Sequence, residues 1–459
     1  MTKTMIRIWA ILAGVTLSMA TAVAQEEGCR VVRDDYEMLQ VQLTAPALRV
    51  EALPTGYDMM TMEGYLPSTA VGAPTLPTFS ALIEVPLNGG YEVTVSEAEY
   101  DTVAVATAAG RRLMPLQPSR SKSDTKPHAL IVDEKIYGAD AYYGEREALV
   151  EAVGVWRDRN LARLQWSPVR YNAVQGTAIV CRKATVTVRY VHPDEAATKA
   201  MYSRYHTPAF RSDAGVINSL YPKSVTTSGV PVRYLIVAYS GFRGQLDNFV
   251  AWKERKGYMT DIVYTDDAAV GNTTASISAY LQSQYTNASA TTPAPTYVLL
   301  VGDEGQLPAF TGTTSSEHIT DLYYMTWTSG DNLPDCYYGR FSAQTVAQLT
   351  PQIDKTLMYE QYTFADPAFL DRAVMVAGVD GGTAGDYGYT HADPAMDYAI
   401  THYINGSMGY SQVRYFKNNT SIVPTGSNVT VASSESGNSA TVRGYYNQGA
   451  GWINYSAHG

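Results

Sequence analysis

Residues 297–303 read Tyr-Val-Leu-Leu-Val-Gly-Asp, an apolar run without alternation that ends in a glycine and an acid. Such a run is typical of a strand buried on both faces, as the strands of parallel sheets are. Similar runs occur at 232–238, 373–379 and 451–455. Stretches with apolar residues at helical spacing separate these runs, at 246–257, 277–281, 345–359 and 394–404. This alternation predicts an α/β domain over 231–459, with a mostly parallel sheet and helices on both faces.

The region from 25 to 200 has a different hydrophobic pattern. Short alternating runs at 81–85, 91–95, 129–132 and 184–190 are separated by turn signals such as Asn-Gly-Gly at 88–90. This pattern predicts a β-rich, sandwich-like domain. Residues 201–230 carry Arg204, Arg211 and a Ser/Thr/Gly run at 224–229. We interpret them as a linker whose basic residues are accessible to proteolysis, with an ordinary interdomain linker as the alternative.

Length and charge limit the class of protein further. The 459 residues suffice for two or three domains, and a net charge of −10 argues against nucleic acid as a partner. Lys3 and Arg7 precede a short apolar run and an Ala-Val-Ala sequence at 22–24, which predicts a secretory signal peptide over 1–24. An uncleaved anchor helix is the alternative. The other apolar runs are too short for a transmembrane segment, so we expect a secreted or cell-surface protein.

Three polar residues directly follow the predicted buried strands: Asp303, Asp380 and His458. Parallel strands end at one edge of a sheet, and ligands of such sheets bind outside that edge, so we expect the three to lie together. A histidine oriented by a carboxylate is the acid–base half of a hydrolase or transferase site. For each residue alone, a loop position capping the next helix is the alternative interpretation.

The sequence offers no clear nucleophile to accompany this pair. Cys336 lies at a predicted strand entry and Cys181 within a predicted strand, where a buried free thiol is the commoner situation, and Cys29 lies near the mature N-terminus. A serine hydrolase is disfavoured because no Gly-x-Ser-x-Gly motif follows a strand.

A loop at 328–335 is rich in oxygen ligands. Asp331 and Asp335 stand four residues apart with backbone carbonyls between them. Together with Asp303 they would supply the hard oxygen atoms that Ca²⁺ prefers, although the spacing is not that of an EF-hand. A solvated turn is the alternative.

With these residues in place, 231–459 resembles the catalytic domain of the gingipain family of secreted cysteine peptidases, which have a caspase-like fold. The matching segments are 232–237, 249–253, 297–303, 338–341, 378–382 and 454–459. The region from 25 to 200, with Gly-Ala-Pro-Thr-Leu-Pro at 72–77, resembles the β-rich propeptide of that family.

The resemblance implies roles for several residues. It makes His458 the catalytic histidine and Asp380 the acid that orients it, at a position where many relatives have Glu. The nucleophilic Cys would follow on a later strand beyond Gly459, so this polypeptide alone should be inactive. The substrates would be proteins or peptides, and the chain's own propeptide would act as inhibitor.

The resemblance also bears on metal and substrate. Asp303, the Thr328 carbonyl, Asp331, the Leu333 carbonyl and Asp335 match a calcium site of the family. His391 and Asp393 match the segment that binds the substrate side chain before the scissile bond. A neutral imidazole at 391 does not pair with a basic side chain as a carboxylate does, so a preference for Arg or Lys is not expected.

We therefore expect a precursor fragment of a secreted gingipain-like cysteine endopeptidase. The alternative is a secreted, non-catalytic surface or sorting protein that keeps the peptidase-like fold, since fold does not fix function. A Cys after an apolar strand downstream of Gly459 would discriminate between the two.

Overall fold

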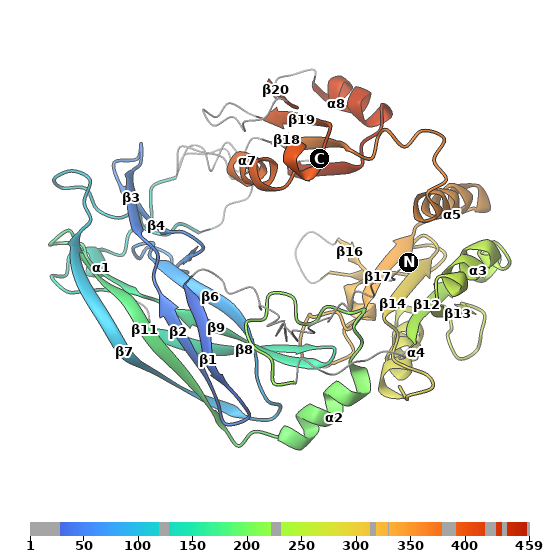
Figure 1. Cartoon of the computed structure of the whole chain (residues 1–459), viewed down its shortest axis with the longest axis horizontal. Coiled ribbons are helices and arrows are strands. Elements are labelled where there is room, and N and C mark those ends of the chain that lie inside the picture. The colour runs from blue at the N-terminus through green and yellow to red at the C-terminus, as the bar shows by residue number, and fades with distance from the viewer. Residues whose placement is uncertain are drawn as a thin grey trace, which may run out of the picture.

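The computed structural model describes residues 28–118, 128–144, 146–221, 231–312, 318–328, 330–378, 392–417, 428–433 and 438–456. Within them the chain forms a β-rich N-terminal domain, drawn in blue to green in Figure 1, and an α/β part drawn in yellow-green to red. The predicted fold class is confirmed in both regions.

The N-terminal domain is a sandwich of two antiparallel sheets. One sheet has the order β1-β2-β11-β10 with β7 also paired to β11, and the other has the order β5-β6-β9-β8. The bounds are β1 Cys29–Asp34, β2 Met38–Thr44, β3 Leu48–Ala52, β4 Asp58–Met62, β5 Leu66–Pro67, β6 Pro77–Glu84, β7 Gly90–Ala104, α1 Glu134–Tyr137, β8 Ala148–Trp156, β9 Arg159–Trp166, β10 Val169–Asn172, β11 Thr177–Val191 and α2 Glu195–Tyr205.

Alternating residues of the two sheets form the core of this sandwich. Leu39, Val41 and Val186 from one sheet pack with Ile83 and Trp166 from the other, and all five are almost completely buried. This alternation is the sequence pattern that predicted the sandwich.

The α/β part contains two separate parallel sheets. The first has the order β13-β12-β14-β17 and the second the order β20-β19-β18-β21. The bounds are β12 Val232–Ala238, α3 Asp247–Arg255, β13 Tyr258–Tyr264, α4 Thr274–Thr286, β14 Tyr297–Val301, β15 Phe310–Thr311, β16 Ile319–Thr320, β17 Tyr337–Phe341, α5 Val346–Gln361, β18 Arg372–Ala377, α7 Ala392–His402, β19 Gln412–Lys417, β20 Val429–Ser433, α8 Asn438–Asn447 and β21 Trp452–Ser456, with short 3₁₀ turns η1 Ser240–Phe242, η2 Leu322–Tyr324 and η3 Gly406–Met408.

Helices cover both faces of the first sheet. Leu235 and Val237 of β12 pack against α4, whereas Ile236 and Ala238 pack with residues of α3 and α5. The second sheet repeats this arrangement, with α7 packed on one face and α8 on the other. Burial on both faces explains why these strands lack hydrophobic alternation.

Two expectations are corrected. The three predicted site residues do not follow strands of one sheet. Asp303 follows β14, which pairs with β12 and β17. Asp380 and His458 follow β18 and β21, which pair with each other in the second sheet. Residues 129–132 do not form a strand. The described part of the predicted linker, 201–221, is packed: α2 extends to Tyr205, and Phe210, Val216, Leu220 and Tyr221 are buried, whereas Arg204 and Arg211 are exposed.

None of the helices in the described ranges combines the length and the apolar character that crossing a bilayer requires.

Candidate functional site

The carboxyl edge of the second parallel sheet brings two strand ends together. Ala377, the last residue of β18, pairs with Ser456, the last residue of β21, and the Gly378 N–H donates to the Ser456 carbonyl at 2.8 Å. Asp380 and His458 follow these strand ends by three and two residues in the sequence. Both residues, together with His391, lie outside the described part of the chain, and of Asp393 only its position near the start of α7 is described.

The carboxyl edge of the first sheet positions Asp303. Its carboxylate accepts hydrogen bonds from Gln344 Nε2 and Ser342 Oγ, both at 2.7 Å, and these two bonds lower the pKa of Asp303. The adjacent loop is held by Arg340 of β17, which donates to the carbonyls of Gly302 and Leu307. Asp303 therefore belongs to a hydrogen-bonded loop on an exposed sheet edge.

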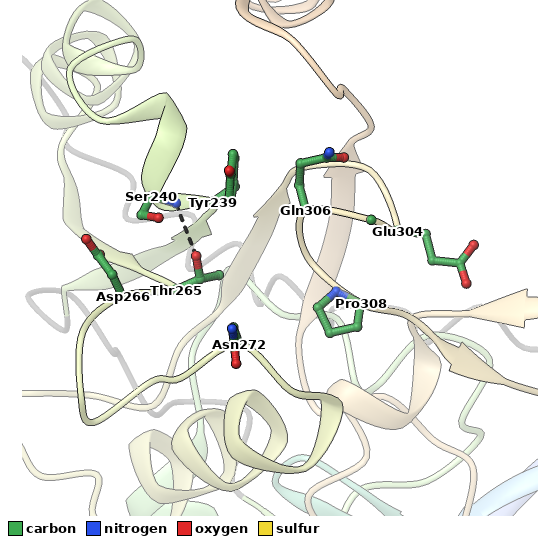
Figure 2. Close-up of a pocket in the computed structure, with 9 residues that line it drawn as sticks. Tyr239, Ser240, Thr265, Asp266, Asn272, Glu304, Gln306 and Pro308 are labelled. Carbon is green, nitrogen blue, oxygen red and sulfur yellow. Dashed lines mark hydrogen bonds between the residues drawn. The ribbon is translucent and has the colours of Figure 1, made fainter.

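A cavity of about 350 Å³ opens at the same edge (Figure 2). It lies beyond the ends of β12 and β14, where the strand order reverses, which is where open α/β sheets bind ligands. The Ser240 N–H donates to Thr265 Oγ1 at 3.1 Å, and Gln306 Oε1 is buried without a hydrogen-bond partner. The cavity is lined by Tyr239, Ser240, Thr265, Asp266, Asn272, Glu304, Gly305, Gln306 and Pro308. None of these residues was predicted from the sequence as a site residue.

Asp335 lies at the opposite, amino edge of the first sheet, just before β17. Its side chain is fully buried and accepts hydrogen bonds from the N–H groups of Trp327, Thr328 and Arg157, at 2.8, 3.2 and 2.8 Å. Burial raises the pKa of Asp335 to about 6, although the three N–H donors oppose the rise. The carboxylate organises its own loop and contacts the N-terminal domain.

The five predicted calcium ligands do not come together. β14 and β17 run parallel with Val301 opposite Phe341, so Asp303 follows the carboxyl end of this pair of strands whereas Asp335 precedes the amino end. Asp331 stays near Asp335, and its carboxylate accepts from the N–H groups of Val155 and Leu333 at 2.9 and 3.0 Å. Among the described residues, no group of three or more His, Cys, Asp or Glu side chains is arranged to hold a metal ion.

Sequence reasoning missed Arg157, whose side chain is 2% exposed at the contact between the two parts of the chain. It lies in the turn between β8 and β9, and its guanidinium donates to backbone carbonyls of the α/β part. The alternating runs on either side could have indicated a hairpin, but no local pattern distinguishes an arginine that docks from an exposed one.

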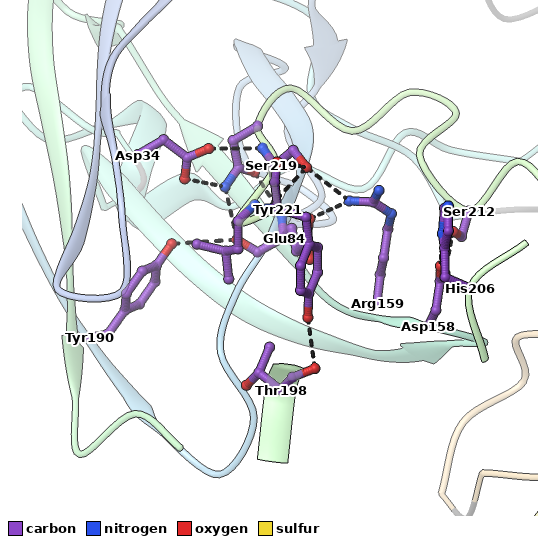
Figure 3. Close-up of polar contacts among 12 residues, drawn as sticks. Asp34, Glu84, Asp158, Arg159, Tyr190, Thr198, His206, Ser212, Ser219 and Tyr221 are labelled. Carbon is purple, nitrogen blue, oxygen red and sulfur yellow. Dashed lines mark hydrogen bonds and ion pairs between the residues drawn. The ribbon is translucent and has the colours of Figure 1, made fainter. Parts of the chain in front are cut away.

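The segment 206–221 is tied to the N-terminal domain by buried polar groups (Figure 3). The Asn218 side chain accepts from the Glu84 N–H at 2.7 Å, and the Leu220 N–H donates to the Glu84 carboxylate. Glu84 also forms an ion pair with Arg159. Burial raises the pKa of Glu84 to about 7 even though Arg159 opposes the rise.

All three cysteines are buried. Burial raises the pKa of Cys336, whose sulfur lies 3.5 Å from that of Met325, and burial likewise raises the pKa of Cys181. A nucleophilic thiol must be accessible and readily ionised, so none of the three suits that role.

Comparison with known proteins agrees with the architecture. The family model of peptidase family C25 matches residues 227–459, and the model Propeptide_C25 matches residues 21–203. Lys-gingipain of Porphyromonas gingivalis is 30% identical over 433 residues, covering 92% of this chain and 23% of its own length. Gingipain R2 of the same organism is 24% identical over 405 residues, covering 84% of this chain and 53% of its own length.

Among solved structures, the Arg-specific cysteine proteinase gingipain R is similar at 22% identity with a TM-score of 0.40, over 50% of this chain and 48% of that one. This chain spans about a quarter of the length of Lys-gingipain and about half that of gingipain R2. Because the C25 model matches just over half of the chain, from 227 to 459, the chain belongs to peptidase family C25.

Proposed function

We propose that this chain is part of the precursor of a secreted cysteine endopeptidase, in which 231–459 contributes to the catalytic domain and 25–200 is the propeptide. The reaction is acyl transfer to a cysteine thiolate. His458 takes the proton from the thiol and later gives it to the leaving amine, and Asp380 orients the imidazole.

The pairing of Ala377 with Ser456 carries this proposal. Two segments that are about 80 residues apart in the sequence leave the sheet as hydrogen-bonded neighbours at its carboxyl edge, and the acid and the histidine follow directly. A carboxylate–imidazole pair needs such neighbouring strand ends, because the two side chains must come within hydrogen-bond reach. The three buried thiols support a nucleophile other than Cys29, Cys181 and Cys336.

Substrates of this peptidase are proteins or peptides. We assign His391 and Asp393 to the segment that receives the substrate side chain before the scissile bond. Since residue 391 is an imidazole rather than a carboxylate, the proposal includes no preference for Arg or Lys at that position.

We place the proposed calcium site in the loop at 328–335. Asp303 is removed from the ligand set because it lies at the other edge of the sheet. The Thr328 and Leu333 carbonyls with Asp331 and Asp335 remain as oxygen ligands of the kind Ca²⁺ prefers, and the ion would stabilise the loop rather than take part in the reaction.

The test uses the protein expressed from its complete coding sequence and matured. We expect a thiol-directed peptidase inhibitor to label one cysteine, and His458→Ala to abolish peptide hydrolysis. Asp380→Asn should lower kcat by at least about 100-fold through loss of imidazole orientation. His402→Ala, at the exposed end of α7, is the matched control and should keep full activity. Absence of hydrolysis and of labelling in the matured protein would favour the non-catalytic surface or sorting protein.

A further inference from the structure

The turn between β8 and β9 has an unusual residue at its first position. Trp156 pairs with Arg159, so Arg157 and Asp158 alone form the turn. Arg157 has φ of 59°, in the left-handed region where glycine or asparagine is favoured. A non-glycine residue kept in this region points to a requirement for its side chain.

The side chain of Arg157 donates four hydrogen bonds, all of them to backbone carbonyls. Its Nη1 donates to the carbonyls of Pro295 and Asp335 at 2.8 Å each, and Nη2 donates to that of Ala294 at 3.2 Å. These three acceptors belong to the α/β part, whereas Nε donates at 2.8 Å to the Tyr205 carbonyl at the end of α2. The acceptors are fixed backbone atoms that match the five-donor fork of a guanidinium and not the point charge of a lysine.

The backbone around Arg157 is bound as well. The Arg157 N–H donates to Asp335 Oδ1 at 2.8 Å, and the Tyr285 hydroxyl donates to the Arg157 carbonyl at 2.8 Å. Next to it, the Val155 N–H donates to Asp331 at 2.9 Å and Trp156 Nε1 donates to the Pro334 carbonyl at 3.1 Å. Every residue from 155 to 157 therefore has a polar partner in the α/β part.

Aromatic rings close the contact around these hydrogen bonds. The Arg157 guanidinium lies 5.4 Å from the centre of the Phe210 ring, which also packs against Trp156 and Tyr337. Tyr205 stacks on Tyr285 of α4 with ring centres 4.1 Å apart. Water is thus kept from the hydrogen bonds, which strengthens them.

We propose that the Arg157 turn is the docking element of the N-terminal domain, and that the carbonyls of 294–295 with the Asp331–Asp335 loop form its receptor on the α/β part. The partner that this receptor fits is a tight hairpin turn presenting one arginine. The inference rests on the proposed function in taking the N-terminal domain as a propeptide. It adds which residues hold the domain in place once the chain is cut within 222–230.

Docking and inhibition are separable in this arrangement. The receptor lies at the amino edge of the first sheet, because Asp335 precedes β17 and Ala294–Pro295 precede β14. The strand ends that precede Asp380 and His458 lie at the carboxyl edge of the second sheet. Loss of the arginine should release the domain without altering any residue that we assign to catalysis.

The test uses the full chain with the recognition site of a specific protease placed within 222–230, cut after folding. Gel filtration at micromolar concentration shows whether the two pieces travel together. We expect them to stay together in the unaltered chain. In Arg157→Gly we expect the dissociation constant to rise on the order of 100-fold or more, because a buried charged partner is lost. Glycine suits the turn at φ of 59°, so the hairpin itself should fold at least as well.

Two further variants complete the experiment. Arg163→Ala removes an exposed arginine of β9, the strand that follows the turn. Arg163 pairs with Glu151, and its loss should leave the pieces together. Asp331→Ala weakens the receptor from the other side, and should raise the dissociation constant about tenfold through loss of one charge-assisted hydrogen bond. Asp331→Ala also tests the docking proposal if Arg157→Gly does not fold.

Separation of the unaltered pieces, or co-elution of Arg157→Gly pieces with unchanged affinity, would overturn the docking proposal. The readout is association alone. Failure here therefore leaves the peptidase assignment untouched, and failure of the peptidase test leaves the docking result standing.

Discussion

Gly154 of β8 faces Asp331 so closely that a Cβ added at residue 154 would lie 2.5 Å from the Asp331 Cβ and 2.6 Å from its Oδ2. The glycine has φ of 145° and lies at a register shift between β8 and β9. The missing side chain thus lets the carboxylate of one part of the chain reach the Val155 N–H of the other.

Gly154→Ala should therefore destabilise the contact. Backbone strain and overpacking together should lower the free energy of unfolding by about 2–4 kcal/mol, since the clash involves the base of the Asp331 side chain and not its flexible end. Urea unfolding followed by tryptophan fluorescence measures this loss. The control is Gly64→Ala, where φ is 76° and no atom lies within 4 Å, so only the backbone strain applies. Equal losses in the two variants would show that Asp331 does not restrict residue 154.

Glu84 should make the stability of the N-terminal domain depend on pH. Burial raises its pKa from 4.5 to about 7 in the folded chain. Its contribution is therefore fully present below pH 4.5 and is lost as pH rises through 7, with a size on the order of 3 kcal/mol. Glu84→Gln should remove this part of the pH dependence, because the glutamine amide stays neutral over the whole range, as the protonated carboxyl of Glu84 does at low pH. The control is Glu92→Gln, at an exposed pair with Arg189.

The measurement is urea unfolding at intervals between pH 4 and 8 for both variants and the unaltered chain. A difference between Glu84→Gln and the unaltered chain that stays constant across this range would contradict the raised pKa.

The three cysteine thiols should not react with thiol reagents in the folded chain. Because Cys29, Cys181 and Cys336 are buried, a thiol reagent such as DTNB should label none of them within minutes under native conditions and all three in denaturant. Ala290→Cys places a thiol at an exposed position and should react at once, which verifies the assay. Rapid native labelling of Cys336 would reopen the question of which thiol is the nucleophile.

The parallel strands could be predicted because burial on both faces leaves a plain signal. β12 and β14 have the predicted bounds, Val232–Ala238 and Tyr297–Val301, and α5 differs from the predicted 345–359 by two residues at most. These elements are determined by local apolar patterns that the sequence displays directly, uninterrupted in the two strands and at helical spacing in α5.

Pairing and docking could not be predicted in the same way. An apolar run indicates that a strand is buried but does not identify the strand with which it pairs. The division into two sheets and the separation of Asp303 from Asp335 could therefore not be predicted. Arg157 has partners that lie 48 to 178 residues away, and nothing within its own hairpin records them. The packing of segment 206–221 likewise depends on Glu84, which is more than 120 residues earlier in the sequence.

Calcium removal tests the remaining metal proposal and the position of Asp303 together. If the loop at 328–335 binds Ca²⁺, EDTA should lower the melting temperature, since a ligand at 100 times its dissociation constant contributes about 2.7 kcal/mol. Asp331→Asn should abolish this response because it removes a charged ligand of the loop. Asp303→Asn should keep the response, because Asp303 lies at the opposite edge of the sheet and is hydrogen-bonded to Ser342 and Gln344. An unchanged melting temperature, with no calcium found by elemental analysis, would remove the metal. Loss of the response in Asp303→Asn would instead mean that the two sheet edges cooperate in binding.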